Sequence, residues 1–209
     1  EAAENLSHSL QDCINYGMEL KFISRSEYVK DNESTARLLF PGLTDAIIVP
    51  EGGYHPLGAT GAALIMKGLT DINATHICTA LGTATTMAGL LKDCHPNQTI
   101  IGIPVLKNMT DINDRLKYLL DGMQTTEPVI FDAYHFGGYA KKNEQLIQFM
   151  NNFYSGTGVP TDFVYTAKMF YGVIDQVEKN YFPEGSAIVC LHTGGLQGNL
   201  SLPAGTLVF

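Results

Sequence analysis

A run of small and hydroxyl-bearing residues, Gly82-Thr83-Ala84-Thr85-Thr86, follows an apolar segment and precedes a helical pattern. Small residues in such a turn leave backbone N–H groups accessible at the start of a helix, and threonine hydroxyls add donors. The run therefore predicts a site for an anion such as phosphate. It is neither a P-loop nor a dinucleotide-binding motif, because the Gly-Lys-Ser/Thr and GxGxxG sequences are absent. The alternative is a turn that only allows close packing of helix and strand.

Two further glycine-containing segments end predicted strands. In residues 49–62, Gly52 and Gly53 allow a ligand to approach the backbone, and His55 is either a base or a helix cap. In residues 190–199, three glycines follow a strand, and His192 is either catalytic or a hydrogen-bonded residue at the strand end. The first segment therefore predicts ligand contacts at the carboxyl edge of the sheet, and the alternative is an ordinary strand-to-helix turn.

Aromatic residues mark two other candidate segments. Residues 134–141 (YHFGGYAK) set two glycines among aromatic rings in a loop, so that Tyr139 either faces a site or fills a lid. Residues 162–172 (DFVYTAKMFYG) put Tyr165 and Thr166 at the start of a helix, where Thr166 is also a reasonable N-cap.

Short apolar runs that alternate with longer helical patterns position these segments. The alternation predicts an α/β fold with three layers, in which helices cover both faces of a mostly parallel sheet. The expected strands are residues 19–23, 46–49, 76–80, 100–104 and 187–191. The expected helices are residues 57–69, 87–91, 110–120, 143–153 and 166–179.

The composition restricts the possible partners. A net charge of −8, with scattered lysines and arginines, argues against nucleic acid and anionic membranes as ligands. No apolar run approaches the roughly 20 residues of a membrane span. The four cysteines have no CxxC spacing and read as reduced cysteines of a cytoplasmic protein rather than a disulfide or zinc site. No other residues show metal-ligand spacing, so we expect no metal.

In this order, the motifs PEGG, GTATTMAG, HFGGYAK, FVYTAK and HTGGLQGN resemble the D-cysteine desulfhydrase and 1-aminocyclopropane-1-carboxylate deaminase family. The resemblance implies a tryptophan synthase β-like fold (fold type II) and pyridoxal 5′-phosphate as cofactor. It also implies a homodimer and a small amino acid as substrate. Residues 1–50 then correspond to the remainder of a small N-terminal domain and a return crossover, and residues 51–209 to a large cofactor-binding domain.

The resemblance assigns roles by position. Gly82, Thr83, Ala84, Thr85 and Thr86 correspond to the loop that holds the cofactor phosphate, and Thr166 to the residue that hydrogen-bonds the pyridine nitrogen. A neutral hydroxyl there implies an unprotonated ring. Tyr165 and Tyr139 correspond to two catalytic tyrosines. Gly52, Gly195 and Leu196 correspond to residues at the substrate end.

The resemblance also predicts what the 209 residues lack. The family's Schiff-base lysine corresponds to a position before Glu1, and Lys168 is not that lysine. The chain opens on a helix-like segment rather than a strand, so we expect it to be a fragment of a longer enzyme that releases ammonia and a 2-oxo acid. Thr166 and the terminal GGLQGN favour D-cysteine over aminocyclopropane carboxylate as substrate. The alternatives are a binding module for a phosphorylated ligand and an inactive protein of the same fold.

Overall fold

The computed structural model describes residues 6–28, 32–42 and 44–209. The chain forms two compact units, Glu1–Glu51 (unit 1) and Gly52–Phe209 (unit 2). The division falls one residue after the boundary expected from the sequence.

Unit 2 is built on a parallel sheet with the strand order β3-β2-β1-β4. Its strands are β1 (His76–Leu81), β2 (Thr99–Pro104), β3 (Val129–Ile130) and β4 (Ile188–Cys190). The structure therefore confirms three of the strands predicted from apolar runs. It adds β3, whose two residues are too few to produce a recognisable pattern.

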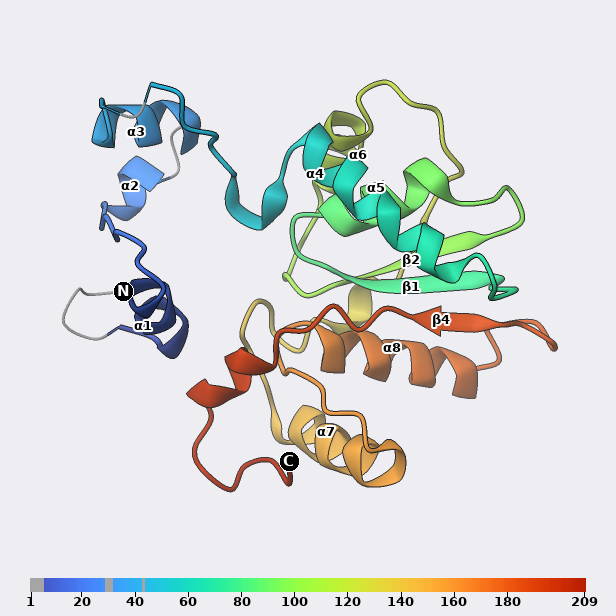
Figure 1. Ribbon diagram of the computed structural model, residues 1–209. Coiled ribbons are helices and arrows are strands. Elements are labelled where there is room, and N and C mark those ends of the chain that lie inside the picture. Colours follow the sequence, from blue (N-terminus) through green and yellow to red (C-terminus); the bar gives the residue numbers. More distant parts are fainter. Residues whose placement is uncertain (1–5, 29–31, 43) are drawn as a thin grey trace. The chain divides into compact units, whose positions relative to one another are not determined.

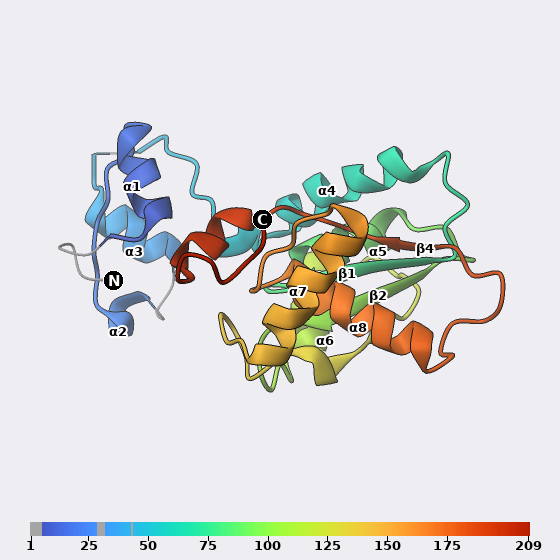
Figure 2. The same cartoon turned by 90° about the horizontal axis from the view of Figure 1, so that it is seen from below.

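Helices cover both faces of this sheet, as expected for three layers (Figure 1). One face carries α4 (Pro56–Ala63), η2 (Leu64–Leu69), α5 (Thr85–Asp93) and α6 (Ile112–Leu120). The other face carries α8 (Thr166–Glu178), and α7 (Glu144–Thr157) packs on α8 (Figure 2). The α/β prediction with a mostly parallel sheet is confirmed.

The side chains of β1 alternate between the two layers because successive residues of a strand point to opposite faces. Ile77 and Leu81 belong to the core formed with α4, α5 and α6. Cys78 belongs to the core formed with α8, where Met169 is buried. Burial on both faces explains why β1 reads as a nearly continuous apolar run.

The helices differ from expectation mainly at their ends. The predicted helix over residues 57–69 is α-helical only to Ala63 and continues as the 3-10 helix η2. Helix α7 continues to Thr157, where Gly158 adopts a left-handed conformation (φ 70°) and ends it.

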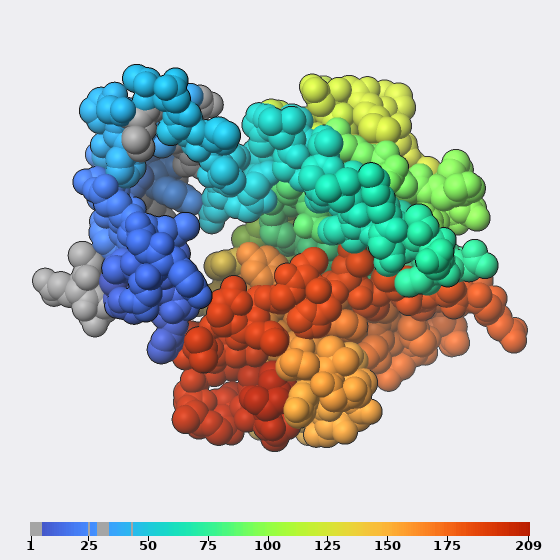
Figure 3. Space-filling view, in the orientation of Figure 1, coloured from blue at the N-terminus to red at the C-terminus, as the bar shows by residue number. Residues whose placement is uncertain are grey.

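The C-terminal segment is attached to α7, beside which it lies in Figure 3. Asn151 donates to the carbonyl of Thr206 (3.1 Å) and accepts from the amide of Val208 (3.0 Å). The ring centroids of Tyr154 and Phe209 lie 4.6 Å apart. The segment that follows β4 is therefore anchored at its far end.

In its described part, unit 1 contains three short helices, α1 (His8–Asn15), α2 (Arg25–Tyr28) and α3 (Asn32–Leu39). The strands predicted at residues 19–23 and 46–49 are wrong, since neither segment is a strand in the structure. A strand persists when a neighbour completes its backbone hydrogen bonds, and the described residues of unit 1 offer no such neighbour. Ile47 and Val49 are accordingly 90% and 76% exposed rather than buried.

The four cysteines are free thiols. Among the described residues, no helix is long and apolar enough to cross a bilayer, and no cluster of side chains could bind a metal.

Candidate functional site

The turn between β1 and α5 leaves the start of α5 without a side-chain cap. Ala84 occupies the N-cap position in a left-handed conformation (φ 70°), and its methyl group cannot accept a hydrogen bond. The first amides of a helix have no partner within the helix, and the helix dipole makes this end attractive to anions. The turn, residues 82–86, is hereafter called the cradle.

Threonine hydroxyls line the cradle, and one of them ties it to a second segment. The hydroxyl groups of Thr83 and Thr85 lie 2.8 Å apart. Thr83 also reaches the carbonyl of Gly52 at 3.3 Å. A Cβ atom at Gly52 would lie only 2.6 Å from Cγ2 of Thr83, so this approach requires glycine. The structure thus brings Gly52 to the cradle.

Of the two predicted catalytic tyrosines, Tyr165 lies beside the cradle and Tyr139 lies next to Tyr165. A Cβ atom at Gly82 would stand 3.2 Å from the ring of Tyr165, so this ring lies against the cradle backbone. The ring of Tyr139 meets that of Tyr165 edge-on, with centroids 5.9 Å apart. The cradle, Tyr165 and Tyr139 therefore form one contiguous group of residues.

A buried carboxylate organises the start of α8. Oδ2 of Asp162 accepts hydrogen bonds from the amides of Val164 and Tyr165, both at 2.8 Å. Oδ1 accepts from the amide (2.9 Å) and the hydroxyl (2.8 Å) of Thr166. Asp162 thus fixes the backbone on which Tyr165 and Thr166 stand.

Thr166 is the first residue of α8 rather than its N-cap, a position that Tyr165 occupies. The capping role considered for Thr166 is therefore wrong, because Asp162 satisfies the exposed amides instead. Thr166 is fully buried, and its hydroxyl also accepts from the amide of Asp162 (2.8 Å).

The loop after β4 reaches the same carboxylate. Gly195 (φ 96°) precedes η4 (Leu196–Ser201), and a Cβ atom there would lie 3.0 Å from Oδ1 of Asp162. Asn199 accepts from the amide of Phe163 (3.2 Å) and donates to the carbonyl of Thr161 (2.9 Å). Gly195 and the neighbouring Leu196 therefore lie near Asp162 and the start of α8.

Lys168, two residues after Thr166, is completely buried. Its ammonium group donates a hydrogen bond of 2.7 Å to the carbonyl of Gly138, the residue before Tyr139. Desolvation lowers the pKa of Lys168 from 10.5 to about 8, although the negative charge of Asp162 acts in the opposite direction.

Two histidines considered as possible bases have structural partners. His55 caps α4 by accepting from the amide of Leu57 (3.1 Å). Nε2 of His192 lies 2.8 Å from the carbonyl of Pro160, and Nδ1 accepts from the amide of Gly194 (3.2 Å). The capping reading of His55 and the strand-end reading of His192 are thus confirmed.

Sequence reasoning assigned no role to three polar residues of this region, Asp162, Lys168 and Asn199. Asp162 could have been found, since an aspartate just before an apolar helical pattern is a helix-start signal. Lys168 falls among apolar residues of α8, but sequence alone gives no indication of its distant partner.

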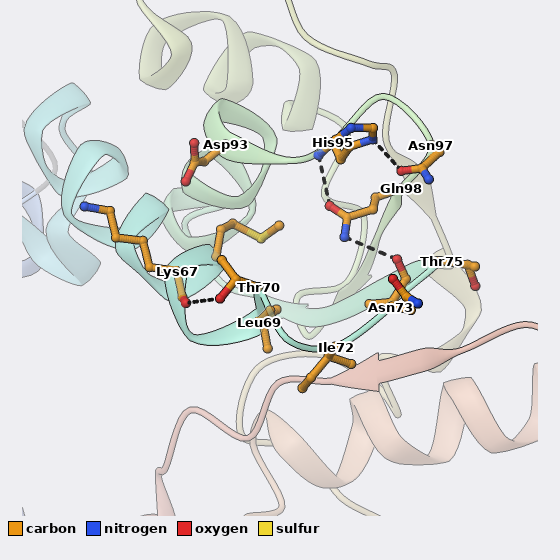
Figure 4. Close-up of a pocket in the computed structure, with 12 residues that line it drawn as sticks. Lys67, Leu69, Thr70, Ile72, Asn73, Thr75, Asp93, His95, Asn97 and Gln98 are labelled. Carbon is orange, nitrogen blue, oxygen red and sulfur yellow. Dashed lines mark hydrogen bonds between the residues drawn. The ribbon is translucent and has the colours of Figure 1, made fainter.

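A separate cavity of about 610 Å³ lies where β1 and β2 begin, at the opposite edge of the sheet. Its polar groups largely bond to protein partners, as Figure 4 shows: Gln98 joins the amide of His95 (2.9 Å) to the carbonyl of Ala74 (3.2 Å). Nδ1 of His95 also lies 2.6 Å from Oδ1 of Asn97. These contacts fit a structural role.

Comparisons with known proteins identify relatives of the chain. No family model matches it. A Pyrococcus abyssi protein named "Putative 1-aminocyclopropane-1-carboxylate deaminase" is 28% identical over 171 residues, which cover 72% of this chain and 50% of that protein. The chain therefore spans about half the length of this curated relative.

Solved structures extend the resemblance to the fold. A crystal structure described as an ACC deaminase homologue superposes with a TM-score of 0.79 and 25% identity, covering 95% of this chain and 65% of the other. An O-acetylserine-dependent cystathionine β-synthase from Helicobacter pylori superposes with a TM-score of 0.57 and 16% identity, covering 90% and 63%. The resemblance and the fold expected from the motifs are thus confirmed.

Proposed function

We infer that this chain, a homologue of the 1-aminocyclopropane-1-carboxylate deaminases with the fold of their pyridoxal 5′-phosphate-dependent relatives, supplies the cofactor-binding part of an enzyme that deaminates a small amino acid. The observation that carries this proposal is the cradle. An uncapped helix start, two paired hydroxyls and an adjacent tyrosine ring stand together in unit 2.

The cradle fits the phosphate group of this cofactor. The amides at the start of α5 are donors, which a phosphate dianion requires. In the structure Thr83 donates to the carbonyl of Gly52 and pairs with the hydroxyl of Thr85, so donation to phosphate requires these two hydroxyls to turn. Gly52 and Gly82 leave space where a Cβ atom would crowd Thr83 or Tyr165. In the proposal, residues 82–86 hold the phosphate.

Bound pyridoxal phosphate supplies an electron sink for the substrate's amino-bearing carbon. Tyr165 and Tyr139 then hold or move protons at the substrate, since the ring of Tyr165 stands beside the cradle and that of Tyr139 contacts Tyr165. Gly52, Gly195 and Leu196 line the substrate end.

In this proposal Thr166 contacts the cofactor ring. In the structure its hydroxyl proton points to Asp162, so donation to a ring nitrogen requires the hydroxyl to turn away from this carboxylate.

The complete enzyme is proposed to be longer than these 209 residues. The chain matches half of its curated relative and 65% of the ACC deaminase homologue. Lys168, two residues after Thr166, is buried and its ammonium group donates to the carbonyl of Gly138, so it is not available to react with a cofactor. From the family resemblance, which places the Schiff-base lysine before the position of Glu1, we propose that this lysine lies outside these 209 residues. The homodimer and the cytoplasmic location stay predictions.

The cradle is tested by measuring the binding of pyridoxal phosphate to the 209-residue chain with ³¹P NMR. We expect saturable binding that Thr85→Ala weakens about tenfold or more, because a hydrogen bond to a charged group is lost. Thr60→Ala is the matched control, since its exposed hydroxyl bonds to the carbonyl of Pro56 within α4. No binding, or equal weakening by both variants, would contradict the cradle.

Reaction class and substrate are tested on the longer protein. Borohydride should fix the cofactor to a lysine outside residues 1–209. Sulfide release from D-cysteine is then compared with 2-oxobutanoate release from aminocyclopropane carboxylate, and we expect D-cysteine to be preferred. Phosphate binding without a fixable lysine would favour the alternative of a non-catalytic binding module.

A further inference from the structure

The loop that carries Tyr139 has an unusual backbone. Phe136, Gly137, Gly138 and Ala140 all have positive φ angles, between 50° and 117°. Phe136 and Ala140 are not glycine, so this conformation is strained and persists only when other contacts fix it. The position of Tyr139 therefore depends on what holds its neighbours.

Three hydrogen bonds within the loop provide part of this support. The amide of Gly137 donates to Nδ1 of His135 (2.9 Å), and the amide of Gly138 to the carbonyl of His135 (3.0 Å). The amide of Lys141 donates to the carbonyl of Gly138 (3.1 Å). All three bonds are local, so by themselves they do not tie the loop to the rest of unit 2.

Lys168 provides a link to α8. Its ammonium group donates to the same Gly138 carbonyl at 2.7 Å, across 30 positions of sequence. Helix α8 also begins with Tyr165 at its N-cap, the residue whose ring meets that of Tyr139. One helix therefore holds both partners of the tyrosine pair, Tyr165 directly and Tyr139 through Gly138.

The burial of Lys168 is hard to explain by packing alone. Burying an ammonium group has a large unfavourable desolvation free energy. An apolar residue of similar volume would fill the same space without this penalty. The buried carboxylate of Asp162 partly compensates the charge. What an apolar residue could not supply is a hydrogen-bond donor to Gly138.

We propose that Lys168 is a positioning residue of the proposed active site, whose hydrogen bond to the Gly138 carbonyl fixes the loop 135–141 and so holds Tyr139 against Tyr165. This rests on the proposed function only for the role of the two tyrosines. The link itself is a property of unit 2 that can be measured without cofactor.

The test is amide hydrogen exchange in the 209-residue chain, comparing wild type, Lys168→Met and Lys92→Met. Methionine keeps the length and apolar stem of lysine and removes the donor. Lys92 is the matched control because its ammonium also donates to a backbone carbonyl, that of Leu120 (3.5 Å), away from the loop.

We expect Lys168→Met to speed exchange at the amides of Gly137, Gly138 and Lys141 about tenfold or more, while amides of α7 and β2 keep their wild-type rates. Lys92→Met should leave the loop unchanged. Unchanged loop exchange in Lys168→Met would overturn the proposal. Faster exchange throughout unit 2 would also overturn it, since it would indicate general destabilisation.

A second measurement covers the case in which Lys168→Met does not fold. In wild-type chain labelled with ¹⁵N-lysine, a buried ammonium gives a slowly exchanging proton signal, and its coupling to ¹³C-labelled glycine carbonyl identifies Gly138 as acceptor. The absence of such a signal would overturn the proposal. In the longer enzyme, Lys168→Met should lower kcat several-fold and leave cofactor affinity within about twofold.

These results separate the two proposals. A chain that fails to bind pyridoxal phosphate contradicts the proposed function, whereas the exchange data address the link between Lys168 and Gly138 alone.

Discussion

Thr83 reaches the carbonyl oxygen of Gly52 at 3.3 Å, across 31 positions of sequence. This contact joins the segment before α4 to the turn that opens α5. Because a Cβ atom at Gly52 would lie 2.6 Å from Cγ2 of Thr83, the side chain at position 52 controls where the Thr83 hydroxyl stands.

Gly52→Ala is therefore expected to weaken phosphate binding at the cradle several-fold, by displacing Thr83. Gly53→Ala is the matched control: Gly53 has a similar φ (63° against 61°), but a Cβ atom there meets nothing within 4 Å. Both variants carry the same backbone strain, and only Gly52→Ala adds the clash. Titration of the two variants with pyridoxal phosphate checks this, and equal affinities would contradict it.

A second glycine pair tests the carboxylate at the start of α8. Gly195→Ala would bring a Cβ atom within 3.0 Å of Oδ1 of Asp162, whereas Gly194→Ala meets nothing within 4 Å at a similar φ (90° against 96°). We expect Gly195→Ala to lower the free energy of unfolding by about 1 kcal/mol more than Gly194→Ala. Urea unfolding measures the difference, and the prediction fails if Gly194→Ala is the more damaging change.

Asp162 itself should be important for stability. Its two oxygens accept four hydrogen bonds, three of them from backbone amides at the start of α8. Asp162→Asn removes the charge that faces this helix end and sets an amide group against donors. We expect a loss of about 2 kcal/mol in urea unfolding. Asn143→Ala, which removes the N-cap of α7, gives a reference for an ordinary cap.

The pKa of Lys168 predicts a dependence of stability on pH. Its folded pKa, about 8, lies below its usual value of 10.5, so between these values the unfolded chain binds more protons than the folded one. Stability then rises with pH across this window, and below pH 8 the folded state bears the unfavourable burial of the ammonium. The unfolding free energy of wild type relative to Lys168→Met should rise by up to about 3 kcal/mol from pH 8 to 10.5. If the difference in unfolding free energy between wild type and Lys168→Met stayed constant across this range, burial of the Lys168 charge would not destabilise the folded state.

Features that depend on residues adjacent in the sequence are predicted well from it. Strands β1 and β2 are nearly continuous apolar runs because both faces of the sheet are covered, and the cradle is recognisable from five consecutive residues. An apolar run becomes a strand only when a partner pairs with it, which is why the expected strands at residues 19–23 and 46–49 are wrong. The bond between Lys168 and Gly138 joins residues 30 positions apart, and no local pattern encodes it.

The two tyrosines provide the sharpest test of chemistry in the longer enzyme. Tyr165→Phe keeps the ring that lies beside Gly82 and removes only the hydroxyl. If that hydroxyl moves a proton during the reaction, kcat falls by about 10² or more while cofactor affinity changes little. Thr85→Ala should do the reverse, since a phosphate hydrogen bond contributes equally to the ground and transition states. Tyr171→Phe, which removes a hydroxyl that accepts a hydrogen bond from Gln145, controls for loss of another tyrosine hydroxyl of α8. If Tyr165→Phe and Tyr171→Phe had equal turnover, Tyr165 would have no part in proton transfer, and the contact between the rings of Tyr165 and Tyr139 would be one of packing alone.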